Sequence, residues 1–320
     1  MRSEKDKSNM FEAIEKQHEH IRTAWDSCPD FSYKFKNIVF CGMGGSGIAG
    51  NLAASIVDKV PFVVNKNYTL PQFVNKDTWV IANSYSGNTE ETLSAYKLAV
   101  ERKAKILCMA SGGQLAGMAK ENGHDLVILP KGFQPRESLM FSLIPVVKIL
   151  WQSKAVDNAE EMCEEAAALI KGNEARDKGE QLAETLKGKI PIIYSGEHLK
   201  AVAMRWKTQV NENAKQPAYY NMFPELNHNE INSFANTPLT FGIIYLRDKA
   251  EHERVAKRFE IIKGLVSHQL EEVWAQGYSR LAKICHLVNL GDWYSYYLAL
   301  LNNTDPTPVS IIESLKKQLQ

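Results

Sequence analysis

Short runs of apolar, mostly β-branched residues alternate with segments of helical periodicity in the first half of the chain. The runs that read as buried strands cover residues 37–42, 61–65, 78–86, 104–111 and 125–131. Amphipathic segments at 46–57 and 88–103 fall between them, and a longer apolar segment at 136–151 reads as a connecting helix. Strands that are separated by helices favour a parallel, doubly wound α/β sheet.

The same alternation starts again in the second half, after the polar stretch at 153–160. Strands are expected at residues 190–196, 218–223, 239–246 and 270–275. Helices are expected at 158–186, 198–215, 251–263, 278–287 and 309–320. We therefore predict two α/β domains, residues 1–152 and 153–320, the second a weak repeat of the first.

Composition excludes several classes of protein. The 320 residues carry a net charge of +1, so no overall field attracts nucleic acid or an acidic membrane. No apolar run approaches the roughly 18 residues of a membrane-spanning helix, and the charged first 20 residues do not resemble a signal peptide. The five cysteines are widely spaced, which is typical of reduced thiols in the cytoplasm.

A glycine-rich turn, Gly42 to Gly47 (GMGGSG), follows the first predicted strand. Such a turn before a helix lets backbone N–H groups approach an anion. Its glycine spacing also fits a dinucleotide site, but the second strand ends in Asn65 and Lys66 instead of the acidic residue that holds a ribose. An ordinary tight strand–helix turn explains this segment alone equally well.

A second turn with polar side chains follows the third predicted strand. Ser84, Ser86 and Thr89 lie in the sequence SYSGNTE and offer neutral donors to phosphate oxygens. A simple helix cap explains one hydroxyl more easily than three. Because the carboxyl ends of parallel strands share one crevice, the two turns are expected to converge on one phosphate.

The pair GMGGSG and SYSGNTEET resembles the sugar-isomerase (SIS) domain, an α/β unit that binds phosphosugars. The resemblance implies two SIS-type subdomains, each a parallel doubly wound sheet flanked by helices. It implies that Ser46, Ser84, Ser86 and Thr89 bind the phosphate, together with the backbone of Gly44 and Gly45. Alone it implies only a phosphosugar ligand, because the family includes isomerases, synthase domains, lyases and sensors.

Further blocks resemble the bifunctional phosphoglucose/phosphomannose isomerases, in order and over nearly the whole chain. They are FQPR (133–136), NENAK (211–215), FPELNHNE (223–230), LGDWYSYYLALLNNTDPTPV (290–309) and SLKK (314–317). The implied reaction is the reversible isomerisation of glucose 6-phosphate, and with it mannose 6-phosphate, to fructose 6-phosphate through a cis-enediol. The implied setting is glycolysis and gluconeogenesis.

The resemblance also assigns roles to residues. Glu212 would move the proton between C2 and C1, and Arg136 would stabilise the enediolate. His228 and Lys316 would open the sugar ring, with Lys317 as the alternative lysine. Two further acids, Glu225 and Glu230, are the other candidate bases, and Thr307 is a candidate for tolerating both epimers at C2.

The remaining expectations concern partners and competing functions. No metal-ligand spacing is evident, so no metal and no cofactor are expected. The resemblance implies a homodimer in which His228 reaches the neighbouring subunit's site. The alternatives are a non-catalytic sugar-phosphate sensor, although the first 36 residues make no convincing helix-turn-helix, and another SIS-domain phosphosugar isomerase.

Overall fold

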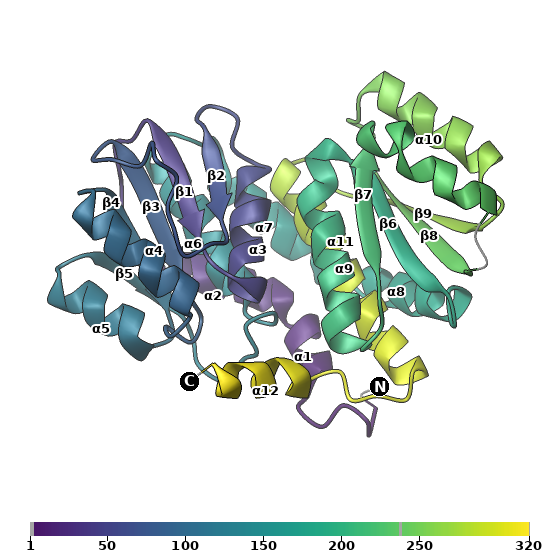
Figure 1. Cartoon of the computed structure of the whole chain (residues 1–320), viewed down its shortest axis with the longest axis horizontal. Helices are drawn as coiled ribbons and strands as arrows, with labels where there is room; N and C mark the ends of the chain where they lie inside the picture. The colour runs from purple at the N-terminus through teal and green to yellow at the C-terminus, as the bar shows by residue number, and fades with distance from the viewer. Residues whose placement is uncertain (1–2, 237–238, 320) are drawn as a thin grey trace. The chain divides into compact units, whose positions relative to one another are not determined.

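The computed structural model describes residues 3–236 and 239–319, and it divides into two compact units (Figure 1). The N-terminal unit comprises Gln17–Ala168 and Ser279–Ala282. The C-terminal unit comprises Leu169–Tyr278 and Lys283–Gln320, together with the initial segment Met1–Lys16. The domain boundary at 152/153 stays a prediction.

The N-terminal unit is built on a parallel sheet of order β2-β1-β3-β4-β5. Its strands are β1 (Asn37–Cys41), β2 (Phe62–Asn65), β3 (Thr78–Asn83), β4 (Lys105–Ala110) and β5 (Asp125–Ile128). The central strand β3 is buried along its whole length, as the continuous apolar run predicts for a sheet covered on both faces. The predicted parallel α/β sheet is therefore confirmed.

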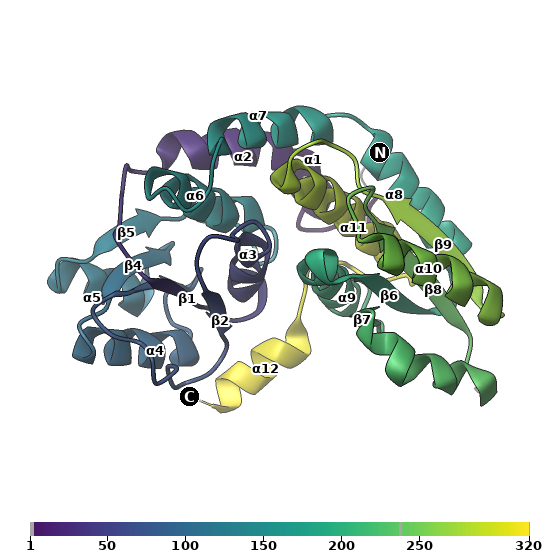
Figure 2. The same ribbon diagram turned by 90° about the horizontal axis from the view of Figure 1, so that it is seen from above.

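Helices cover both faces of this sheet. The helices of this unit are α2 (Gln17–Ser27), α3 (Gly44–Ala54), α4 (Glu90–Glu101), α5 (Gly113–Glu121), α6 (Leu139–Gln152) and α7 (Ala159–Ile170), and α2 packs against α6. Figures 1 and 2 show α4 and α5 on one face and α3 and α6 on the other. The predicted helix at 136–151 begins later, at Leu139, because residues 134–138 form a turn in which Glu137 and Ser138 donate to the carbonyl of Gln134.

The C-terminal unit repeats the plan with a parallel sheet of order β7-β6-β8-β9. Its strands are β6 (Ile190–Gly196), β7 (Tyr219–Phe223), β8 (Phe241–Arg247) and β9 (Gln269–Trp274). Its helices are α1 (Met10–Glu15), α8 (Glu174–Thr185), α9 (Lys200–Asn213), α10 (Glu253–Leu265), α11 (Arg280–Leu301) and α12 (Ser310–Gln318). Short 3-10 helices occupy η1 (Glu197–Leu199), η2 (Glu225–His228) and η3 (Glu230–Asn236).

Two further segments differ from the sequence prediction. The segment 158–186 is broken at 171–173 into α7 and α8, where Gly172 and Asn173 weaken the helix. The helix predicted to end at residue 287 continues to Leu301 through Gly291. A Cβ at Gly291 would lie 2.3 Å from the Trp206 ring nitrogen, so the glycine permits close packing of α11 on α9.

Candidate functional site

The glycine-rich turn between β1 and α3 is joined directly to the turn after β3. The Oγ of Ser46 accepts a 3.0 Å hydrogen bond from the backbone N–H of Tyr85. The side-chain amide of Asn83 donates to the carbonyl of Ser46 at 3.0 Å. Met43, the residue before α3, supplies no side-chain cap, so the first N–H groups of this helix point toward the turn as an anion site requires.

Gly45 allows the segment that carries Arg136 to lie against this turn. A Cβ at Gly45 would be 2.6 Å from the carbonyl carbon of Pro135 and 2.7 Å from the nitrogen of Arg136. Arg136 itself is only 2% exposed. Tyr85 supports the same segment, because its hydroxyl donates to the carbonyl of Pro130 at 2.8 Å and accepts from the N–H of Phe133 at 2.9 Å.

The predicted phosphate-binding hydroxyls of the second turn lie within one loop after β3. The buried Ser84 donates through Oγ to Oγ1 of Thr89 at 2.9 Å. The exposed Ser86 accepts at Oγ from the N–H of Asn88 at 3.2 Å. Thr89 precedes α4 without a side-chain cap bond. These hydroxyls and the glycine turn share the carboxyl edge of neighbouring strands β1 and β3, where the strand order reverses and ligands bind in such folds.

Lys66 lies at the same edge and is not among the predicted phosphate-binding residues. Its Cε lies 3.4 Å from the position that a Cβ on Gly47 would occupy. Burial lowers the pKa of its ammonium group. The sequence feature that could have identified Lys66 is its position directly after β2. Because β2 pairs with β1, it ends beside the same glycine-rich turn.

The candidate base Glu212 lies in the last turn of α9, where its side chain is half-buried. Lys215 closes that turn: its Nζ donates to the carbonyl of Glu212 at 2.7 Å and to that of Asn213 at 3.2 Å. The backbone that carries Glu212 is therefore fixed at the end of the helix.

His228 ends the 3-10 helix η2, and its side chain is exposed. The residues beside it are anchored. Asn227 accepts from Nη1 of Arg258 at 3.0 Å, and Asn229 donates to Glu225 at 2.9 Å. This anchoring fixes the position of an accessible imidazole on a short segment.

The alternative bases have different surroundings. One oxygen of Glu230 accepts from the hydroxyl of Tyr194 at 2.6 Å, and the other accepts from Asn221. Burial and this bond to Glu230 raise the pKa of the Tyr194 hydroxyl. Both oxygens of Glu230 are thus engaged in holding the loop, whereas Glu225 is exposed and accepts from Asn229.

The two candidate lysines both lie on α12. Lys316 and Lys317 are exposed, as are the other described residues of this helix. Because both lysines are exposed on the same helix, the assignment of Lys316 instead of Lys317 as the catalytic lysine stays a prediction. Thr307, which precedes α12, is buried.

The predicted residues thus fall into two groups. Those for phosphate binding, with Arg136, belong to the N-terminal unit and line adjacent turns. The structure places Glu212, His228 and Lys316 on three separate elements of the C-terminal unit.

Metal-binding clusters and membrane-spanning helices are both missing from residues 3–236 and 239–319. Within these ranges no group of three His, Cys, Asp or Glu side chains is arranged to hold a metal ion. None of the helices in the same described ranges is long and apolar enough to cross a membrane. All five cysteines lie within the described ranges, are buried and form no disulfide.

Comparison with known proteins finds a family model for each half of the chain. The family model described as a SIS domain matches residues 33–129, and that of the bacterial phospho-glucose isomerase C-terminal SIS domain matches residues 175–319. A hypothetical protein from Thermus thermophilus shares the fold, with a TM-score of 0.72 at 15% identity, over 99% of this chain and 91% of that one.

Two curated relatives match almost end to end, and both are named bifunctional phosphoglucose/phosphomannose isomerase. The Aquifex aeolicus protein is 42% identical over 92% of this chain and 94% of its own. The Caldicellulosiruptor bescii protein is 40% identical over 97% of this chain and 98% of its own. With this identity over nearly its full length, the chain belongs to the bifunctional phosphoglucose/phosphomannose isomerase family.

Proposed function

We propose that this enzyme reversibly isomerises glucose 6-phosphate and mannose 6-phosphate to fructose 6-phosphate. The observation that carries the proposal is the joined pair of turns after β1 and β3, in a chain about 40% identical to enzymes named for both activities. Neither turn alone would identify the ligand, but together they supply hydroxyls and helix N–H groups at one edge.

The sugar phosphate is held by neutral donors. Ser46, Ser84, Ser86 and Thr89 offer hydroxyls, and Gly44 and Gly45 offer backbone N–H groups at the start of α3. A helix N-terminus and hydroxyl donors stabilise a dianion without a large local positive charge. This agrees with a chain whose net charge is only +1.

Glu212 moves the proton. Its carboxylate takes the proton from C2 of the open-chain aldose, the C2–H electron pair forms the C1–C2 double bond, and the carbonyl oxygen at C1 takes up the charge. The proton then returns to C1 while the proton of the O2 hydroxyl passes to O1, so that the carbonyl forms at C2 and O1 becomes a hydroxyl. The guanidinium of Arg136 stabilises the enediolate, while His228 and Lys316 exchange protons with the ring oxygen and O1 during ring opening.

One intermediate accounts for both aldoses. C2 is trigonal in the cis-enediol, so the configuration that distinguishes glucose from mannose is lost there. Return of the proton to either face of C2 gives either aldose, provided that the intermediate can turn about C2–C3.

The experiment is a coupled assay that starts from fructose 6-phosphate and measures both aldose phosphates, with the wild-type chain and Glu212→Gln. Formation of both products by the wild type alone is the expected result. Binding without turnover would indicate a sensor instead, and turnover of other phosphosugars only would indicate a different SIS-domain isomerase.

The active assembly is a cytoplasmic homodimer in which His228 serves the partner's site. The exposed, anchored position of His228 supports this role. The test is to co-refold two inactive variants, Glu212→Gln and His228→Ala. In a symmetric dimer, service in trans restores about a quarter of wild-type activity, because about half of the dimers are mixed and each has one intact site. Service within one subunit restores none, and that result would overturn the proposal.

A further inference from the structure

We propose that Asp292 and Ser295 of α11 are positioning residues, which orient the Glu212 carboxylate by fixing the rotation and register of α9. The inference rests on the proposed role of Glu212 as the base. Both residues lie within the block LGDWYSYYLALLNNTDPTPV, in which only Thr307 has been named as a candidate functional residue so far.

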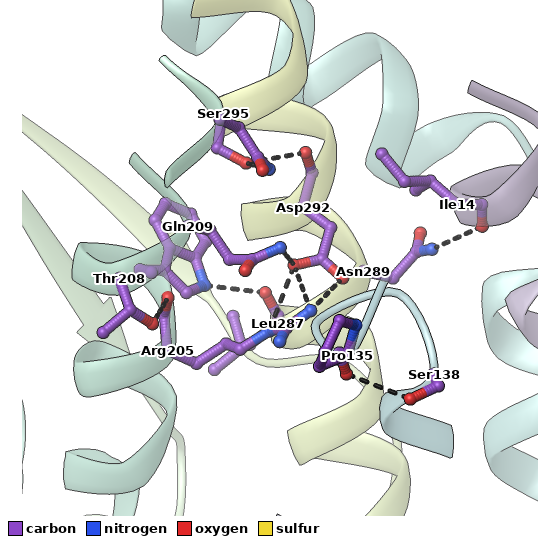
Figure 3. A network of polar contacts seen from close by, with 12 residues as sticks. Ile14, Pro135, Ser138, Arg205, Thr208, Gln209, Leu287, Asn289, Asp292 and Ser295 are labelled. Atoms are coloured by element: carbon purple, nitrogen blue, oxygen red, sulfur yellow. Dashed lines mark hydrogen bonds and ion pairs between the residues drawn. The ribbon is translucent and has the colours of Figure 1, made fainter. Parts of the chain in front are cut away.

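The first contact is a buried ion pair between the two helices (Figure 3). Arg205 and Asp292 are each 1% exposed. Nη2 of Arg205 lies 3.0 Å from both carboxylate oxygens of Asp292, and its Nε lies 3.2 Å from Oδ1. Gln209, one turn further along α9, donates to the same Oδ1 at 2.9 Å. Asp292 is thus bound by two side chains on one face of α9.

The same face continues to the end of α9. Asn213, one more turn along, donates through Nδ2 to Oγ of Ser295 at 3.0 Å, and Ser295 donates to the carbonyl of Asp292 at 3.0 Å. Residues 205, 209 and 213 therefore form a stripe at i, i+4 spacing, and each is tied to the short α11 segment 292–295.

Glu212 precedes the last member of this stripe by one residue. On an α-helix this step turns the side chain by about 100°. The Glu212 carboxylate therefore points about 100° away from the helix face that contacts α11. A rotation of α9 about its axis would move this carboxylate out of place. The end of the helix is held as well: Lys215 donates to the carbonyl of Pro306 at 3.0 Å, and Asn302 donates to that of Ala214 at 3.1 Å.

Stability alone does not explain such a polar contact. Well-packed apolar side chains join two helices at least as well as a buried ion pair, whose desolvation offsets much of its attraction. Directional hydrogen bonds instead allow only one rotation of α9 about its axis and one register of α9 along α11. A base that serves both C2 and C1 needs that definition, because a displacement of about 1 Å can lower a rate by about 100-fold.

The principal variant is Ser295→Ala, which removes the acceptor for Asn213. The matched control is Thr208→Ala, which removes a hydroxyl of the same helix that bonds to the carbonyl of Arg205. The substrate is glucose 6-phosphate deuterated at C2. The readouts are kcat, KM and the fraction of deuterium found at C1 of the product instead of in water.

We expect Ser295→Ala to lower kcat by about tenfold, leave KM nearly unchanged and lower the fraction of label transferred, because a displaced carboxylate exchanges with water before it returns the proton. Ser295→Thr, which keeps the hydroxyl, should recover the transfer, and Thr208→Ala should match the wild type. The proposal would be overturned if Ser295→Ala lowered the amount of folded protein but left kcat per folded site and the fraction of label transferred at their wild-type values.

A second variant separates position from folding. Asp292→Asn alone leaves the Arg205 guanidinium buried without its countercharge, so it can fail to fold. The paired change Arg205→Met with Asp292→Leu removes both charges and should fold, but it should show the same loss of label transfer. Wild-type transfer in this folded pair would also contradict the proposal.

The controls distinguish this inference from the function on which it rests. An inactive wild type, or an active Glu212→Gln, contradicts the proposed function. An active wild type and an inactive Glu212→Gln, together with unaltered transfer in Ser295→Ala and in the paired variant, contradict only the role of Asp292 and Ser295.

Discussion

The two sheets reverse strand order at the same point but present different chemistry there. In the N-terminal unit the turns after β1 and β3 carry glycines and hydroxyls. In the C-terminal unit the corresponding segments after β6 and β8 carry His198 and Asp248. Asp248 pairs with Lys283 of α11 at 2.7 Å and lies 3.5 Å from Nε2 of His198.

The difference shows that two sheets of the same topology can bind different groups at the point where the strand order reverses, because the side chains at that point determine the ligand. Burial of Asp248 favours its neutral form, but the hydrogen bonds from Lys283 and the backbone N–H of Ala250, together with the charges of Lys283 and His198, outweigh this and hold the pKa of the carboxyl below its usual range. Asp248 is therefore an ionised carboxylate paired with Lys283, and an ionised carboxylate offers no hydrogen-bond donor to a phosphate. We infer that the N-terminal unit holds the phosphate and that the C-terminal unit supplies proton-transfer groups.

The largest expected effect is that of Glu212→Gln, which breaks the chemistry assigned to the C-terminal unit. Loss of a general base lowers kcat by about 10²- to 10⁴-fold, while the KM for fructose 6-phosphate changes little. The matched control is Glu225→Gln, an exposed carboxylate in the same unit. A variant of Glu212 that kept wild-type kcat would show that Glu212 is not the base.

Ser84→Ala should have the next largest effect, on substrate binding. A hydrogen bond to a charged group contributes about 1.5–3 kcal/mol, so KM should rise by about 10- to 100-fold with a smaller change in kcat. Ser195→Ala, in strand β6 of the other sheet, is the control and should leave KM unchanged. Equal effects of the two substitutions would contradict the assignment of phosphate binding to one sheet.

Asp248→Asn should change the pH dependence of stability more than activity. Because the pKa of Asp248 is lowered in the folded state, its stabilising contribution is present above the pKa of an unfolded Asp, about 3.9, and is lost as pH falls through the lower folded value. Thermal unfolding from pH 7 to pH 3 should show a smaller decline for Asp248→Asn than for the wild type. A large rise in KM for this variant would instead place Asp248 in phosphate binding.

The smallest expected effect is that of chelation. The proton-transfer roles are assigned to Glu212, His228 and Lys316, and the stabilisation of the enediolate to Arg136; none of these roles requires a metal ion. Turnover should therefore be unchanged after prolonged treatment with EDTA. Loss of activity that zinc restored would show that the C-terminal unit's chemistry depends on a bound ion.

Local patterns were enough to predict much of the fold. The apolar runs predicted the strands of both sheets, because buried parallel strands appear as continuous hydrophobic segments. The end of α11 was missed because Gly291 reads as a break, although its contact with Trp206 makes it part of the packing. The break at 171–173 was missed because Ala- and Glu-rich sequence on both sides favours one continuous helix.

The sequence predicted residues of the candidate site only where they belong to recognisable motifs. The glycine and hydroxyl turns were evident from residue types and their place after strands. Lys66 and Asp292 were not, since their significance depends on neighbours distant in sequence: Lys66 lies beside Gly47, and Asp292 binds Arg205, which is 87 residues away. Such contacts follow from strand order and helix packing, which no local pattern encodes.

The most direct test of the account follows fructose 6-phosphate in deuterated water by NMR with the wild-type chain. We expect that glucose 6-phosphate and mannose 6-phosphate both appear, that a fraction of each carries deuterium at C2 because exchange with the solvent competes with direct transfer from C1, and that Glu212→Gln forms neither. Formation of only one aldose, or of both without deuterium at C2 and without dependence on Glu212, would contradict a shared enediol formed by this base.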